Sequence, residues 1–152
     1  MDETEYNYAY SDFNERPCVF AKAVLCGCCG CHHSQRLHIA EREVMACRDA
    51  AAQQRCADWF ELLQDKSRFA LHLLSGHEQL PHAKAIKVQC GGPRGLLAAL
   101  SGETLADTHT VPDLAALLNK ALSAYADLDA FPYQDIVRYI SHHPIKKRSR
   151  RD

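Results

Sequence analysis

In the first half of the chain, apolar side chains recur at the three- and four-residue spacing of amphipathic helices. Residues 34–48 and 50–64 each carry one such stripe, and a shorter helix is expected to follow Ser67 and to stop at Gly76. A shorter run, from Cys18 to Cys26, has room for two helical turns. The two stripes consist of Leu37, Ala40, Val44 and Cys47, and of Cys56, Trp59, Phe60 and Leu63.

Residues 86–90 follow a different pattern, because apolar and polar side chains alternate there. This alternation predicts one short extended segment that ends at Cys90. A glycine-rich turn, Gly91 to Gly95, comes next and leads into an apolar helix that ends near Gly102. Strand, glycine turn and helix resemble an anion-binding loop, but the lysine and hydroxyl residue of a P-loop are missing.

The last third of the chain predicts two helices without cysteine, over residues 110–126 and 132–142. Thr110 is a candidate cap of the first, and Pro112 suits its first turn. Both helices carry a continuous apolar face and serve as scaffold. The expected fold is therefore mainly α: a small helical bundle with a cysteine-rich turn and one short extended segment.

Composition narrows the class of protein. The 152 residues are 47% hydrophobic and 24% charged, with a net charge of −1, as in soluble globular domains. An acidic aromatic arm is expected over residues 1–16, one domain over 17–143 and a basic tail over 144–152. No apolar run approaches a membrane span, and the acidic start lacks the features of a signal peptide. We therefore expect a cytoplasmic protein with reduced thiols and no membrane contact.

The most informative stretch is residues 26–33, where four of the eight cysteines fall within six positions and two histidines follow. Thiolate is the soft ligand that selects zinc, copper(I) and iron–sulfur clusters. Gly27 and Gly30 allow the backbone to turn tightly around an ion. Adjacent cysteines tend to point different ways, so we expect only two or three of the four to ligate.

The spacing Cys-x10-Cys-Gly-Cys-x15-Cys-x8-Cys, followed by Val88-Gln89-Cys90-Gly91-Gly92, resembles a family of short, cysteine-rich, uncharacterised bacterial proteins. The resemblance covers residues 17–95 and implies no established activity. It implies a set of ligating thiols in which Cys26 and Cys28 are extra. This set consists of Cys18, Cys29, Cys31, Cys47, Cys56 and Cys90.

Six thiols exceed the four that one zinc ion or one simple cluster needs. The thiols are also scattered over several expected elements, which favours a buried iron–sulfur cluster over the closely paired ligands of a zinc site. Zinc remains the alternative. Cys47 and Cys56 fall on apolar stripes, where they act either as ligands or as core residues, and His32 and His33 are further candidate ligands.

Two functional classes follow. The first is a non-enzymatic metalloprotein that carries an iron–sulfur cluster for electron transfer, redox sensing or cluster and metal delivery, with a protein partner. The second is a zinc-stabilised module that contacts nucleic acid or an acidic partner through its tail. Five positive charges lie within residues 146–151 of that tail. No catalytic arrangement of side chains stands out, so the sequence does not favour an enzyme.

Overall fold

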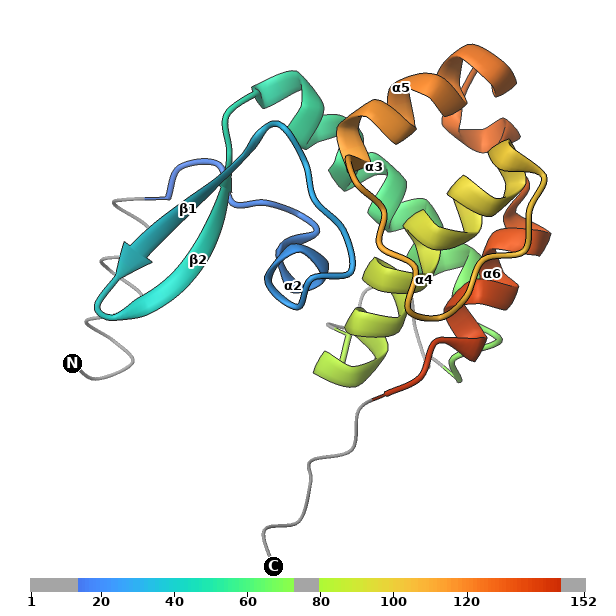
Figure 1. The fold of residues 1–152 in the computed structure, drawn as a ribbon, viewed down its shortest axis with the longest axis horizontal. Helices are drawn as coiled ribbons and strands as arrows, with labels where there is room; N and C mark the ends of the chain where they lie inside the picture. The colour runs from blue at the N-terminus through green and yellow to red at the C-terminus, as the bar shows by residue number, and fades with distance from the viewer. Residues whose placement is uncertain (1–13, 73–79, 146–152) are drawn as a thin grey trace, which may run out of the picture.

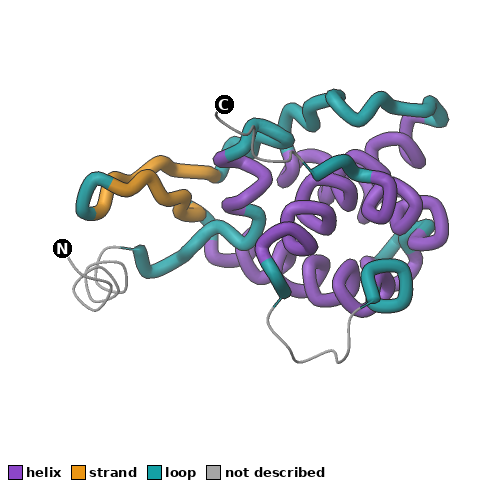
Figure 2. Tube along the Cα trace, turned by 90° about the horizontal axis from the view of Figure 1, so that it is seen from below, coloured by secondary structure: helices purple, strands orange, loops and turns teal. Residues whose placement is uncertain are grey.

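The fold, seen in a computed structural model that describes residues 14–72 and 80–145, joins a β-hairpin to a group of packed helices (Figure 1). Figure 2 shows the two strands at one end of the molecule and the long helices at the other. The hairpin strands are β1 (Ser34–Ile39) and β2 (Arg42–Cys47). The helices are α2 (Ala21–Leu25), α3 (Ala50–Ser67), α4 (His82–Ser101), α5 (Leu114–Tyr125), the 3-10 turn η1 (Leu128–Ala130) and α6 (Tyr133–His142).

The expectation of a mainly α protein is confirmed, with a two-stranded antiparallel sheet added to the helices. Most of the predicted acidic arm and of the basic tail falls outside the described residues. Where the described part begins, Asn14 is buried and its side-chain amide donates to the Met45 carbonyl at 3.2 Å. None of the described helices combines the length and the apolar character that crossing a bilayer requires.

Helix α4 runs through the middle of the helical group and packs most extensively against α6. Trp59 of α3 is fully buried in this core, and its ring stacks on Phe20 at a centroid distance of 5.6 Å. Leu96 of α4 and Ile136 of α6 are also fully buried. The burial of these large side chains supplies the main driving force for packing the helices together.

The prediction of a helix over residues 34–48 is wrong, because this segment forms the β-hairpin. Ala40 and Glu41 make the turn with φ angles of 52° and 68°, the backbone conformation of a tight hairpin connection. Leu37 and Val44 are directly opposite one another in the register. The same two residues would share one face of a helix, so their spacing alone does not separate the two structures.

The prediction of an extended segment at residues 86–90 and a glycine turn after it is also wrong, since both lie inside α4. Every residue from Val88 to Leu96 is buried. A helix that is covered on all sides has no polar face, so its sequence lacks the helical period. A Cβ added to Gly91 would lie 2.5 Å from the Cα of Ile140, which shows that this glycine permits close packing against α6.

Three further helix predictions have mixed outcomes. The helix expected over 50–64 is α3, which begins after the cap Asp49 and continues to Ser67. The prediction of a separate helix after Ser67 is wrong for residues 68–72, which form turns. Residues 73–76 of the predicted helix lie outside the described residues. The helix expected over 132–142 is confirmed as α6.

The two remaining helices differ from expectation at their ends. Helix α5 is capped by Asp113 and not by Thr110, because the Asp113 carboxylate accepts a hydrogen bond from the Ala116 amide. The expected helix from Cys18 to Cys26 shortens to the five residues of α2. Cys18 therefore lies before that helix and Cys26 directly after it.

Candidate metal centres

The structure sorts seven of the eight cysteines into two groups. We call the first group the thiol tetrad, because its four side chains line one small cavity. We call the second the thiol triad, because its three sulfur atoms lie close together at the C-terminal end of α2. The tetrad consists of Cys18, Cys31, Cys47 and Cys56, and the triad of Cys26, Cys28 and Cys90.

Two members of the tetrad are held by backbone pairing beside β2. The Cys18 amide donates to the Met45 carbonyl at 3.0 Å, and the Cys47 amide donates to the Arg16 carbonyl at 2.7 Å. Residues 16–18 therefore run alongside β2 as a short third strand-like segment. This pairing places Cys18 next to the end of the hairpin from which Cys47 projects.

The other two members come from the ends of neighbouring elements. The Cys31 carbonyl accepts hydrogen bonds from the Ser34 amide at 3.1 Å and from the Ser34 hydroxyl at 2.7 Å. Since Ser34 is paired with Cys47 in the sheet register, these bonds hold Cys31 near Cys47. Cys56 lies in the second turn of α3, so one long helix supplies the fourth thiol.

Two thiols of the tetrad, Cys18 and Cys56, resist ionisation while no cation is bound. Burial, with a smaller contribution from the neighbouring thiols, raises the pKa of Cys18 to about 11 and that of Cys56 to about 12. Four thiolates side by side would repel one another strongly. A bound cation removes this penalty, because it stabilises the thiolate form of each ligand.

The cavity inside the tetrad has a volume of about 20 Å³, and its wall also includes Val19, Ala52 and Leu114. This volume admits a sphere the size of a water molecule. No three of the four tetrad sulfurs lie within 4.8 Å of one another. A single ion with zinc–sulfur bonds of about 2.3 Å would draw four sulfurs to about 3.8 Å from one another, so the tetrad is wider than a zinc site.

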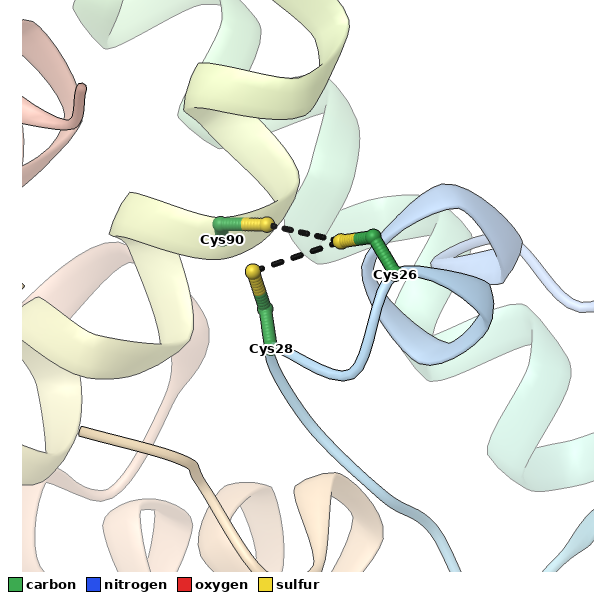
Figure 3. A group of neighbouring side chains, drawn as sticks. All are labelled: Cys26, Cys28 and Cys90. Carbon is green, nitrogen blue, oxygen red and sulfur yellow. Dashed lines mark hydrogen bonds between the residues drawn. The ribbon is translucent and has the colours of Figure 1, made fainter. Parts of the chain in front are cut away.

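The triad is much tighter (Figure 3). The sulfur of Cys26 lies 3.3 Å from that of Cys28 and 3.6 Å from that of Cys90. Cys26 and Cys28 flank Gly27, whose φ of 83° lets the chain reverse after α2, and Cys90 projects from the middle of α4. The neighbouring Gln89 accepts a hydrogen bond from the Ala23 amide at 3.2 Å, which fixes α2 against α4.

One thiol of the triad is ionised most easily. The pKa of Cys28 is lowered to about 6, because a hydrogen bond from the Cys90 thiol, together with a bond from Cys26 and the charge of Arg94, outweighs the effect of burial. The same contacts leave Cys90 as the proton donor, and its pKa is raised. Arg94 is buried, and its Nη1 donates to Nδ1 of His143 at 2.9 Å.

The sequence-predicted set divides between these groups. Four of its six residues form the tetrad, Cys90 joins the triad, and Cys29 belongs to neither. Cys29 is buried, and its backbone bridges to Val111. Cys26 and Cys28, which the resemblance treats as extra thiols, are two of the three triad members. Their Cys-Gly-Cys spacing is a local signal, but nothing in the sequence shows that Cys90 meets them.

The two histidines that follow the cysteine-rich turn stack on one another, with ring centroids 4.0 Å apart. Nδ1 of His32 lies 2.6 Å from the Asp113 carboxylate, so this imidazole is paired with the cap of α5. Among the described residues, no histidine belongs to the tight triad of ligand atoms. The prediction that His32 or His33 ligates a metal stays a prediction.

Comparison of the chain with protein-family models, with curated proteins and with solved structures found no match. The resemblance to cysteine-rich bacterial proteins therefore stays a prediction. The class that the fold and its thiols define is a mainly α protein with a cysteine cluster able to bind a metal.

Proposed function

We propose that this protein is a cysteine-ligated metalloprotein that binds one iron–sulfur cluster through Cys18, Cys31, Cys47 and Cys56. The observation that carries the proposal is that these four thiols, from four separate segments, line one cavity. Four cysteine thiolates are the ligand set of both the simple two-iron and the simple four-iron cluster. All four had been expected as ligands from the sequence.

The spacing of the tetrad supports a cluster over a single zinc ion. A cluster divides its four thiolates among two or four iron atoms, so at most two of the sulfurs share one ion and the set as a whole is wider than at a single zinc ion. The tetrad sulfurs do not converge within 4.8 Å in any group of three. This wide spacing fits a polynuclear centre.

The surroundings favour electron transfer as the role of this cluster. A centre with four protein thiolates has no open iron position, so it does not bind a substrate directly. Apolar side chains such as Val19 and Leu114 limit the access of water to the cluster. Exclusion of water tunes the reduction potential of the cluster and protects it. Each thiol of the tetrad is only partly buried, which leaves the centre near the surface for a protein redox partner.

Anaerobic purification of the full chain tests this proposal. We expect a brown protein whose iron content is matched by acid-labile sulfide. Cys56→Ser should abolish the colour, whereas Cys29→Ala should keep it, because Cys29 lies outside the tetrad. A colourless protein with stoichiometric zinc that depends on Cys56 would overturn the cluster and favour the zinc-stabilised module with its basic tail.

A further inference from the structure

The thiol triad is separate from the proposed cluster site, and its sulfur–sulfur distances fit a single metal ion. Its two shortest sulfur–sulfur distances are 3.3 and 3.6 Å, and all three sulfurs lie within 4.8 Å of one another. Tetrahedral coordination with bonds of about 2.3 Å requires sulfur–sulfur edges of about 3.8 Å. The triad therefore already has nearly the spacing that one zinc ion would impose.

The charges around the triad also suit a divalent ion. The Arg94 guanidinium is 2% exposed, and Arg94 lines the same cavity as Cys28. Apart from Cys28, its hydrogen-bond partners are neutral, since Nε donates to the His109 carbonyl at 3.1 Å and Nη1 to the His143 ring at 2.9 Å. Three thiolates, one guanidinium and one Zn²⁺ together carry no net charge, which avoids the cost of a buried unpaired charge.

The fourth coordination position has no ligand from the described residues. Beyond the triad, no histidine, cysteine, aspartate or glutamate atom of the described part completes the group within 4.8 Å. On one side, Cys26 and Cys28 form part of the wall of a cavity of about 450 Å³. Cys26 is itself exposed. Structural zinc sites are closed by four protein ligands, whereas reactive or exchangeable sites keep a position for an outside ligand.

We propose that Cys26, Cys28 and Cys90 hold a single zinc ion whose fourth position opens to this cavity. Water occupies that position at rest, and an incoming thiolate can replace it. Transfer of the ion then proceeds by ligand exchange: the first incoming sulfur–zinc bond forms as the zinc–water bond breaks, and the water returns to solvent. A second incoming sulfur–zinc bond forms as the bond to the exposed Cys26 breaks, and the freed Cys26 thiolate takes up a proton from solvent. No electron moves in this step, so it needs no oxidant or reductant. The triad is thus an exchangeable zinc site beside the proposed cluster.

The test uses the full chain, purified anaerobically, with iron and zinc measured together. Zinc alone is titrated into the protein in competition with a chromophoric chelator. We expect one zinc per chain in the triad, removed by the chelator while the iron content stays constant. Loss of a group that only supports a zinc ligand lowers metal affinity by about 10- to 100-fold. Cys26 is a proposed direct ligand, so Cys26→Ser should weaken zinc binding by at least this factor. Because Cys26 is exposed, this variant should fold.

Two further variants keep the two sites distinguishable. Cys29→Ala removes a thiol of the same loop that belongs to neither group, so zinc affinity should match that of the wild type. Cys56→Ser should lose iron and retain the triad zinc. Unchanged zinc affinity in Cys26→Ser overturns the proposal. Loss of iron in Cys26→Ser also overturns it, because the triad would then belong to the cluster. Binding of copper(I) in preference to zinc in a parallel titration overturns the choice of ion.

Discussion

The sulfur atoms of Cys26 and Cys90 lie 3.6 Å apart, although 64 positions separate the two residues in the chain. The contact exists because α2 ends against the middle of α4, where glycines allow close packing of the surrounding helices. It joins the cysteine-rich turn to the helical core. The two segments that carry the triad are therefore fixed relative to one another before any ion binds, which lowers the entropic cost of ligation.

The tetrad is expected to stabilise the attachment of the hairpin to the helices. An isolated two-stranded hairpin is at best marginally stable, and the tetrad links β2 to α3 through Cys47 and Cys56. Cys47→Ser should lose the cluster and lower the melting temperature, because binding free energy at such a site is also folding free energy. Circular dichroism with and without a chelator measures this effect. If Cys47→Ala and Cys56→Ala both retain full iron, the two residues are core residues.

Gly91→Ala should destabilise the protein by about 1–3 kcal/mol, the usual cost of overpacking. The added Cβ would lie 2.5 Å from the Cα of Ile140, and backbone atoms cannot move aside cheaply. Gly92→Ala is the matched control, because its Cβ would meet the end of the Leu63 side chain at 2.7 Å, which can change rotamer. Urea unfolding compares the two variants. Equal losses of stability would mean that α4 and α6 can move apart more easily than their close backbone contact indicates.

Asp113→Ala should lower the free energy of unfolding by about 1 kcal/mol at neutral pH, the typical value of a helix cap. Burial opposes ionisation, but hydrogen bonds from His32 and the Ala116 amide outweigh it and lower the pKa of Asp113. A lowered pKa in the folded state stabilises the protein above the unfolded pKa of about 3.9 and is lost as the pH falls through the folded value. The difference between wild type and Asp113→Asn should therefore shrink on acidification. A constant difference between about pH 2 and about pH 7, a range that lies on both sides of the unfolded pKa of about 3.9, would contradict this assignment.

Deletion of residues 146–152, which lie outside the described part of the chain, should leave the iron and zinc contents unchanged. Every cysteine precedes this segment. We expect only weak nucleic-acid binding by the intact chain, and deletion should reduce its salt dependence, because each lost phosphate contact removes about one unit of the log–log salt slope. Fluorescence anisotropy with labelled double-stranded and single-stranded nucleic acid measures the affinity and its salt dependence. Tight, sequence-specific binding that requires the tail would favour the nucleic-acid module over the electron carrier.

Two amphipathic segments could be predicted because their signals are local. Residues 50–64 and 132–142 have one apolar and one polar face, and the structure places helices over both. The prediction of a helix over residues 34–48 failed for a specific reason. Leu37 and Val44 share a face in a helix and in a hairpin, and in the structure residues 16–18 pair with β2 and support the sheet. The choice depends on contacts that no local window contains.

The sequence by itself determined that the protein is mainly helical and that its chemistry rests on cysteine, since periodicity and composition are properties of neighbouring residues. Only the tertiary structure decided how the thiols are grouped. Cys18, Cys31, Cys47 and Cys56 surround one cavity because a hairpin register and one turn of α3 bring them there. Cys90 was expected in a strand but lies on a buried helix beside Cys26, because the helices that cover α4 remove the polar face by which a sequence reveals a helix.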